Sequence, residues 1–163
     1  MTSNFILDRA IIALAAISLL SLSTAFYFEY FLNLAPCNLC VWQRWPHALI
    51  VIFAFPTIIT NRFKSFACLL ALIFIITSAL LAGYHTGIEA KYWPGPQSCS
   101  GIKNIQTLSS EAFLSQILKT PIIQCDKIAW SFLKLSMAGW NFLISISLIP
   151  LWLYVTLTTF RNH

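Results

Sequence analysis

The run Ala10–Phe28 (AIIALAAISLLSLSTAFYF) holds nineteen residues without a charge, between Arg9 and Glu29. The hydrocarbon core of a bilayer is spanned by about 20 apolar residues in a helix. This run therefore predicts a transmembrane helix near residues 10–28, and it places the chain among membrane proteins.

The same pattern recurs three times along the chain. Uncharged runs of seventeen, twenty-four and twenty-six residues lie between Arg44 and Arg62, between Lys64 and Glu89, and between Lys134 and Arg161. They predict further spans near 45–61, 66–86 and 138–159. The composition agrees, because 58% of the 163 residues are hydrophobic and only 9% are charged, whereas soluble domains carry roughly 25% charged residues.

The second run contains Pro46 and Pro56. Pro46 is expected in the first turn of the helix, which tolerates proline, and Pro56 is expected to kink the span. The predicted fold class is all-α, an integral membrane four-helix bundle formed by a single domain over residues 1–163. Two loops on one side, near 29–44 and 87–137, complete the predicted fold.

The long loop contains one amphipathic stretch, Ser109–Leu118. A serine supplies the N-cap and Glu111 lies in the first turn. Apolar side chains recur at helical spacing on one face, at Phe113, Leu114, Ile117 and Leu118. Pro121 then ends the helix. The stretch predicts a short helix that lies on the membrane surface.

The charges that flank the spans predict their orientation. Four spans place both termini and the Arg62–Lys64 turn on one side. The basic residues there abut span ends, while several of the five lysines of the long loop lie farther from a span end, where they weigh less. We therefore expect cytoplasmic termini. Four of the five cysteines then face the oxidising compartment, where disulfides persist, and Cys68 is expected to be a small buried apolar residue.

The short loop carries Cys37-Asn38-Leu39-Cys40, and the long loop carries Cys99 and Cys125. Two pairs of loop cysteines in a membrane protein favour thiol–disulfide redox chemistry. A helix that begins near Cys40 would present the positive end of its dipole to the thiols, and Arg44 would add a permanent charge one turn on. Both effects lower a thiol pKa, so we predict that the first pair is redox active.

Other functions fit these residues less well. A structural zinc site needs four ligands, and the Cys-x-x-Cys has no second close pair to complete it, so no metal is expected. A purely structural disulfide framework stays an alternative, although a four-residue ring constrains little chain. The ten Lys and Arg residues form no basic stripe, which argues against nucleic acid as a partner. Small proton-coupled transporters need a carboxylate inside the membrane, and the four runs hold none.

Arg44 and His85 lie at matching ends of neighbouring predicted spans. Arg44 opens the second span on the loop side and His85 closes the third there, so the two can face one another at the depth of the loop cysteines. A cation and a proton donor suit a quinone, since the arginine polarises a ring carbonyl and its neighbour supplies protons. Gln43 adds a hydrogen-bond donor. Glu29 and His47 are expected to be residues of the membrane interface.

Three stretches of the chain carry a family resemblance. They are Cys37-Asn38-Leu39-Cys40-Val41-Trp42-Gln43-Arg44-Trp45-Pro46, then Tyr84-His85-Thr86-Gly87-Ile88-Glu89 with Trp93-Pro94-Gly95-Pro96 and Cys99, and finally Cys125-Asp126 with Trp130-Ser131-Phe132-Leu133. In this order they resemble the DsbB family of bacterial disulfide-forming membrane proteins, over nearly the whole chain. The Trp-Pro-Gly-Pro insertion departs from the best-known enterobacterial form of that family.

The resemblance implies a membrane disulfide oxidoreductase. A soluble thioredoxin-fold oxidase, DsbA or a relative, would attack a Cys99–Cys125 disulfide, and Cys99 would carry the mixed disulfide. Electrons would pass to Cys37 and Cys40, and from Cys40 to a membrane quinone, ubiquinone or menaquinone, that Arg44 contacts. The resemblance also implies the bacterial inner membrane, with the cysteine loops in the periplasm.

Two alternatives stay open at this point. A quinone reductase of the vitamin K epoxide reductase kind is also a small helical membrane protein with a Cys-x-x-Cys. In that family the motif falls late, whereas here it follows the first span. A non-catalytic membrane scaffold with structural disulfides would keep working without Cys37, and an electron relay would stop.

Overall fold

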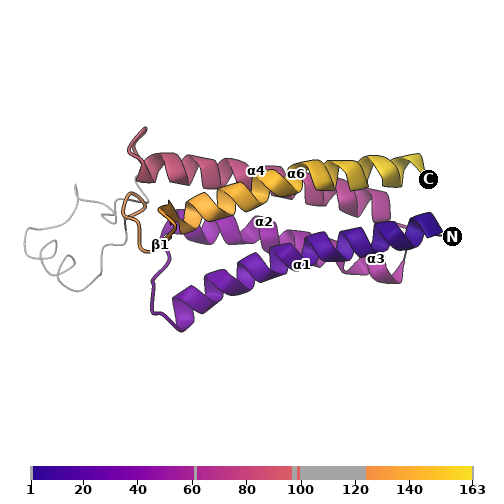
Figure 1. Ribbon diagram of the computed structural model, residues 1–163, viewed down its shortest axis with the longest axis horizontal. Coiled ribbons are helices and arrows are strands. Elements are labelled where there is room, and N and C mark those ends of the chain that lie inside the picture. Colours follow the sequence, from indigo (N-terminus) through magenta and orange to yellow (C-terminus); the bar gives the residue numbers. More distant parts are fainter. Residues whose placement is uncertain (1, 61, 97–98, 100–123, 163) are drawn as a thin grey trace, which may run out of the picture.

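The computed structural model describes residues 2–60, 62–96, 99 and 124–162, and Figure 1 shows their arrangement. Four long helices occur in these residues: α1 (Thr2–Tyr30), α2 (Asn38–Ala54), α4 (Lys64–Glu89) and α6 (Met137–Arg161). The short elements are the one-turn helix α3 (Pro56–Ile59) and an antiparallel hairpin of β1 (Ser131–Phe132) and β2 (Leu135–Ser136). The long helices run side by side, with both chain ends at one end of the molecule and the hairpin at the other (Figure 1).

Three of the described helices are long and apolar enough to cross a membrane. They cover Phe5–Tyr30, Lys64–Glu89 and Met137–Arg161. Each is longer than the span predicted for it near 10–28, 66–86 or 138–159, because the helix continues past the charged or polar residues that bound the apolar run. The long loop accordingly shortens to the residues between Glu89 and Met137.

The second predicted span, 45–61, is wrong in its bounds. Helix α2 begins at Asn38 because the Sγ of Cys37 accepts a hydrogen bond from the backbone N–H of Cys40, which caps the helix. Pro46 therefore lies inside α2 and not in its first turn, and the short loop shrinks to the residues between Tyr30 and Asn38. Pro56 is the first residue of α3, so the helical run is interrupted between α2 and α3. Helix α2 itself has only 17 residues.

The hairpin is a feature that the sequence did not predict, and it qualifies the all-α expectation. Leu133 and Lys134 form its two-residue turn with φ angles of 51° and 65°. Turns with two positive φ angles usually contain Asn-Gly or Asp-Gly, so Leu-Lys gave no signal. The predicted surface helix Ser109–Leu118 lies outside the described residues.

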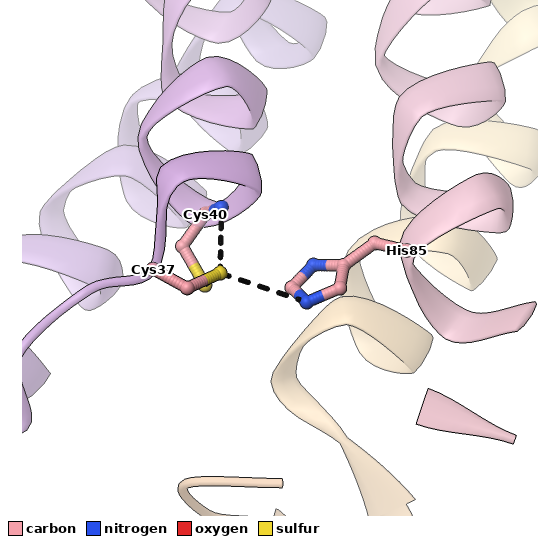
Figure 2. A group of neighbouring side chains, drawn as sticks. All are labelled: Cys37, Cys40 and His85. Carbon is pink, nitrogen blue, oxygen red and sulfur yellow. Dashed lines mark hydrogen bonds between the residues drawn. The ribbon is translucent and has the colours of Figure 1, made fainter. Parts of the chain in front are cut away.

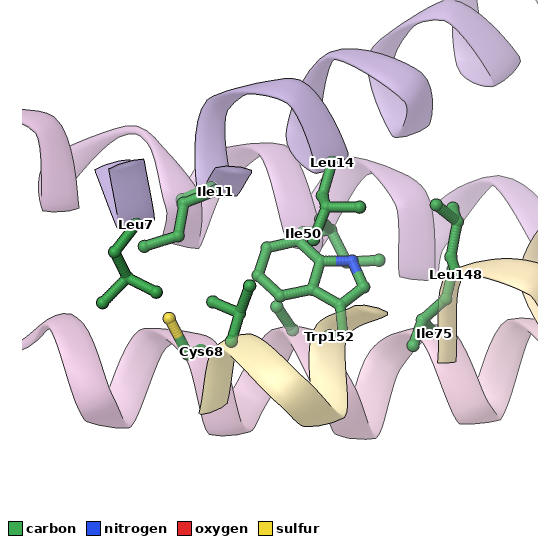
Figure 3. Close-up of a cluster of buried hydrophobic side chains, with 11 residues drawn as sticks. Leu7, Ile11, Leu14, Ile50, Cys68, Ile75, Leu148 and Trp152 are labelled. Carbon is green, nitrogen blue, oxygen red and sulfur yellow. The ribbon is translucent and has the colours of Figure 1, made fainter. Parts of the chain in front are cut away.

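The core lies in the half of the molecule nearer the chain ends, where side chains from all four long helices meet (Figure 3). Trp152 of α6 is fully buried there, against apolar residues that include Ile11 of α1, Ile50 of α2 and Ile75 of α4. Cys68 belongs to this cluster and is 1% exposed, as predicted for a small buried apolar residue. Van der Waals packing of this kind, and not the hydrophobic effect, holds helices together in lipid.

The opposite half of the molecule is less tightly closed. Figure 1 shows α1 diverging from the other helices toward its C-terminal end. A cavity of about 480 Å³ lies here, lined by residues of α1, α2, α4 and α6 and by Phe132 of the hairpin. We refer to it as the inter-helix cavity.

Candidate functional site

The four loop cysteines gather in one buried apolar cluster. Cys99 and Cys125 are joined by a disulfide, while Cys37 and Cys40 are free thiols. Cys37, Cys99 and Cys125 are each at most 6% exposed and pack with Leu39 and Ile88, and Cys40 packs against this cluster. The two pairs, far apart in sequence, therefore lie together in one cluster.

The first pair has the geometry of a redox dithiol at a helix start. The Sγ atoms of Cys37 and Cys40 are 2.8 Å apart, and Cys37 Sγ also accepts the backbone N–H of Cys40 at 3.2 Å (Figure 2). The hydrogen bond from the Cys37 thiol lowers the pKa of Cys40, against burial, which raises it. The same shared proton, with burial, raises the pKa of Cys37. Cys40 is therefore the thiol that ionises first.

His85 points at this pair from α4. Its Nε2 atom lies 3.6 Å from Cys37 Sγ, and its Nδ1 atom lies 2.8 Å from Nε2 of Gln43 (Figure 2 shows the first contact). The Gln43 amide donates to Nδ1, so the ring proton is on Nε2 and faces the sulfur. His85 also contacts the backbone of Cys125. The imidazole thus links both cysteine pairs.

Arg44 lies on the wall of the inter-helix cavity, as do Cys40, Gln43 and His85. Its guanidinium donates to the carboxylate of Glu29 on α1 and covers the ring of Phe26, 4.9 Å from the ring centroid. The sequence interpretation placed Glu29 at the membrane interface without a partner. The ion pair forms because α1 continues to Tyr30 and so carries Glu29 to the level of Arg44.

A buried polar chain connects the site to the middle of the molecule. Asn141 of α6 donates to Oε1 of Gln43 at 2.8 Å, and its own Oδ1 lies 2.9 Å from Nε2 of His47. His47 is 3% exposed and also bonds Ser78, so its side chain faces the interior of the helix bundle. Sequence reasoning missed Asn141, although a lone Asn in an apolar run is the kind of residue that marks a buried contact in membranes.

Glu89 is a second residue that the sequence interpretation did not assign. Its Oε2 accepts a hydrogen bond from Ser136, which also caps α6 by accepting the N–H of Gly139. Its Oε1 lies 3.8 Å from Nε2 of His85, one helical turn earlier. The signal that could have identified it is the i, i+4 spacing from His85 at the end of a span.

The inter-helix cavity has the chemistry of a site for a flat apolar ring that bears oxygen atoms. Aromatic and aliphatic side chains make up most of its wall, among them Phe28, Trp130 and Trp140. Arg44 also lies on this wall, where its positive charge would polarise a carbonyl oxygen of a ring in the cavity. These residues fit a quinone.

Comparisons with known proteins identify the family of the chain. A family model described as "Disulfide bond formation protein DsbB" matches residues 8–155. The "Disulfide bond formation protein B" of Haemophilus influenzae is 34% identical over 134 residues, which cover 78% of this chain and 73% of that protein. Its counterpart in Acinetobacter baumannii is 30% identical over 145 residues, 83% of each chain.

A further relative is the "Uncharacterized protein RP370" of Rickettsia prowazekii. It is 32% identical over 139 residues, which cover 85% of this chain and 81% of that protein. No solved structure matches the chain. The family match covers most of the sequence and includes all four loop cysteines, so the chain belongs to the DsbB family, the multi-pass membrane oxidoreductases of disulfide bond formation.

Proposed function

We propose that this chain reoxidises a periplasmic thioredoxin-fold oxidase of the DsbA type and passes the electrons to a membrane quinone. One observation carries the proposal: the Cys37–Cys40 pair lies between the Cys99–Cys125 disulfide and the inter-helix cavity. Cys37 packs in the cluster with that disulfide, while Cys40 lines the cavity. A relay needs a carrier that faces both its electron source and its electron sink.

The first exchange takes place at the loop disulfide. A partner thiolate attacks Cys99, the Cys99–Cys125 bond breaks, and Cys125 leaves as a thiolate. The second partner thiol then displaces Cys99, so the partner is oxidised and the two loop cysteines hold the electron pair. They reduce a Cys37–Cys40 disulfide in the same way. This exchange ends with Cys37 and Cys40 as thiols and the loop pair joined again.

The second exchange regenerates the Cys37–Cys40 disulfide. A quinone in the cavity, ubiquinone or menaquinone, would supply the two-electron acceptor, since the quinol forms from it with two electrons and two protons. Cys40 faces the cavity with the lowered pKa that a reactive thiolate needs. Arg44, on the wall of the cavity, brings a permanent positive charge to a ring oxygen. His85 holds its Nε2 proton toward Cys37 and can donate a hydrogen bond to a thiolate at that position.

The proposed membrane arrangement uses four crossings. Helices α1, α4 and α6 supply three, and α2 from Trp45 onward, continued by α3, supplies the fourth in a four-helix bundle. The chain ends then lie in the cytoplasm, and the hairpin and cysteine cluster lie at the periplasmic face of the bacterial inner membrane. The basic residues next to the span ends support this orientation.

The test follows quinone absorbance in the ultraviolet after mixing the full chain, a quinone and a reduced DsbA-type partner. We expect the absorbance to fall only when all three are present, and to stay constant with Cys37→Ala or Cys40→Ala. Cys68→Ala is the matched control, since Cys68 lies in the separate core cluster, and it should keep turnover. Full turnover by either loop variant would exclude the relay and leave a scaffold role.

A further inference from the structure

We propose that the reduced form of this protein binds one Zn²⁺ ion through Cys37, Cys40, His85 and Glu89, and that oxidation of the dithiol abolishes the site. Potential donor atoms of the first three residues all lie within 4.8 Å of one another. The three come from two helices and are buried or half-buried. The proposal goes beyond electron transfer and rests on the proposed function only for its effect on turnover.

Two of the distances between ligand atoms are close to those of a tetrahedral zinc site. Zn–S bonds of about 2.3 Å and Zn–N or Zn–O bonds of about 2.0–2.1 Å place neighbouring ligand atoms roughly 3.3–3.8 Å apart. The sulfur of Cys37 is 3.6 Å from His85 Nε2, and that nitrogen is 3.8 Å from Glu89 Oε1. The two sulfurs, at 2.8 Å, share a hydrogen bond. A cation that replaces the thiol protons would let the two sulfur atoms separate to roughly 3.8 Å.

The carboxylate of Glu89 lies beside the imidazole but outside the group of donors within 4.8 Å of one another, so it has to move toward the sulfurs to become the fourth ligand. Ser136 holds Oε2, so Oε1 is the oxygen that faces the imidazole. The Glu89 side chain is only 8% exposed, and a buried carboxylate is stable when it is paired or coordinates a cation. Two thiolates, an imidazole and a carboxylate form a donor set that suits Zn²⁺.

Gln43 supplies the outer support that zinc-bound histidines need. A ligating imidazole donates its other ring N–H to an acceptor, which fixes the ring and raises its basicity. The Gln43 carboxamide lies 2.8 Å from His85 Nδ1. Turning that carboxamide over presents its oxygen to Nδ1–H and leaves Nε2 free for the metal, provided that Asn141 turns over as well. Zinc binding then releases the thiol protons to solvent.

The consequence for the relay is inhibition. A dithiolate that coordinates zinc no longer offers its sulfurs to an acceptor, and a Cys37–Cys40 disulfide cannot coordinate the metal as a pair of thiolates. Zinc and the oxidised state therefore exclude one another. Zinc added to the reduced chain should protect both cysteines from alkylation.

The experiment titrates Zn²⁺ against a chromophoric chelator with the purified full chain in detergent, reduced by a phosphine and then desalted without air. We expect one zinc per reduced chain and none per oxidised chain. His85→Ala should weaken binding by at least the roughly 10- to 100-fold that loss of an outer-shell partner causes. Glu89→Gln should weaken it as well. Cys68→Ser is the matched control and should bind as the unaltered chain does.

Two results would overturn the proposal. Equal affinity in His85→Ala would show that the dithiol binds zinc alone, and lost affinity in a Cys99→Ser, Cys125→Ser double variant would move the site to the four cysteines. If His85→Ala does not fold, Co²⁺ added to the unaltered reduced chain reports the ligands by its tetrahedral visible bands, and the lack of those bands would count against the site. The zinc titration contains neither quinone nor partner, so it does not depend on the proposed function. A chain that binds zinc in this titration but consumes no quinone in the separate turnover assay would contradict only the proposed function.

Discussion

Arg44 on α2 and Glu29 on α1 form an ion pair on the wall of the inter-helix cavity. The pair joins two helices that diverge toward this end of the molecule (Figure 1). It occupies one terminal nitrogen of the guanidinium and leaves Nε buried and without a partner among the described residues. Glu29 therefore acts on Arg44 as a positioning residue, since the ion pair holds the guanidinium at the cavity wall.

Replacing Arg44 should affect the KM values for the two substrates of the proposed relay differently. We expect Arg44→Ala to raise the apparent KM for quinone by about 10- to 100-fold, the equivalent of one hydrogen bond from a charged donor. The KM for the partner oxidase should change much less. Steady-state assays that vary each substrate in turn measure both values. Arg62→Ala, an exposed residue at the opposite end of the molecule, is the control, and a parallel rise of both constants would argue against a quinone contact.

The low pKa of Cys40 depends on its neighbour. The thiolate of Cys40 should appear below the usual thiol pKa of 9.0, because the hydrogen bond from Cys37 stabilises it. Cys37→Ala removes that bond, so the titration midpoint of Cys40 should rise. The pH dependence of ultraviolet thiolate absorbance in the reduced chain measures the midpoint. A midpoint that is unchanged in the variant would assign the effect to the helix start or to Arg44.

Gly87 should not tolerate a side chain. A Cβ there would lie 2.0 Å from the ring of Trp93, which stacks on Tyr84 and donates its Nε1–H to the Tyr84 carbonyl. We expect Gly87→Ala to lower the free energy of unfolding by about 1–3 kcal/mol, as overpacking does. In a Trp93→Ala background the same change should have almost no effect. Denaturant unfolding of the unaltered chain, the two single variants and the double variant tests this. An equal loss of stability from Gly87→Ala in both backgrounds would contradict the steric cause.

Ser136 holds two parts of the site together. Ser136→Ala removes the N-cap of α6 and the donor to Glu89, so it should lower the free energy of unfolding by about 1–3 kcal/mol. Ser136→Thr keeps a hydroxyl and should restore most of the loss. Ser147→Ala, at an exposed position of the same helix, should change little. Denaturant unfolding in detergent compares the three variants.

The membrane-spanning helices α1, α4 and α6 could be predicted from the sequence because a long apolar run leaves the backbone in lipid no alternative to internal hydrogen bonds. Helix α2 was harder to delimit. Its first turn contains Cys40, and its start depends on a sulfur-to-backbone contact of the N-cap residue Cys37 that hydropathy does not register. The hairpin turn at Leu133 and Lys134 also lacks the usual residues.

The candidate site also contains some residues that the sequence could identify and others that it could not. Cys37, Cys40, Arg44 and His85 could be selected because reactive and charged side chains are rare at the ends of apolar runs. Their partners could not be selected. Glu29, Glu89 and Asn141 gain their contacts only when helices far apart in sequence pack together.

The sequence by itself determined that the chain is helical, enters the membrane and carries two pairs of loop cysteines, because these properties follow from local composition and spacing. Only the tertiary structure decided that the thiols of the first pair lie beside His85 and that Arg44 pairs with Glu29 on the cavity wall. The physical reason is that such contacts depend on how α1, α2, α4 and α6 are rotated about their axes and on how far each helix extends. Packing in three dimensions sets both.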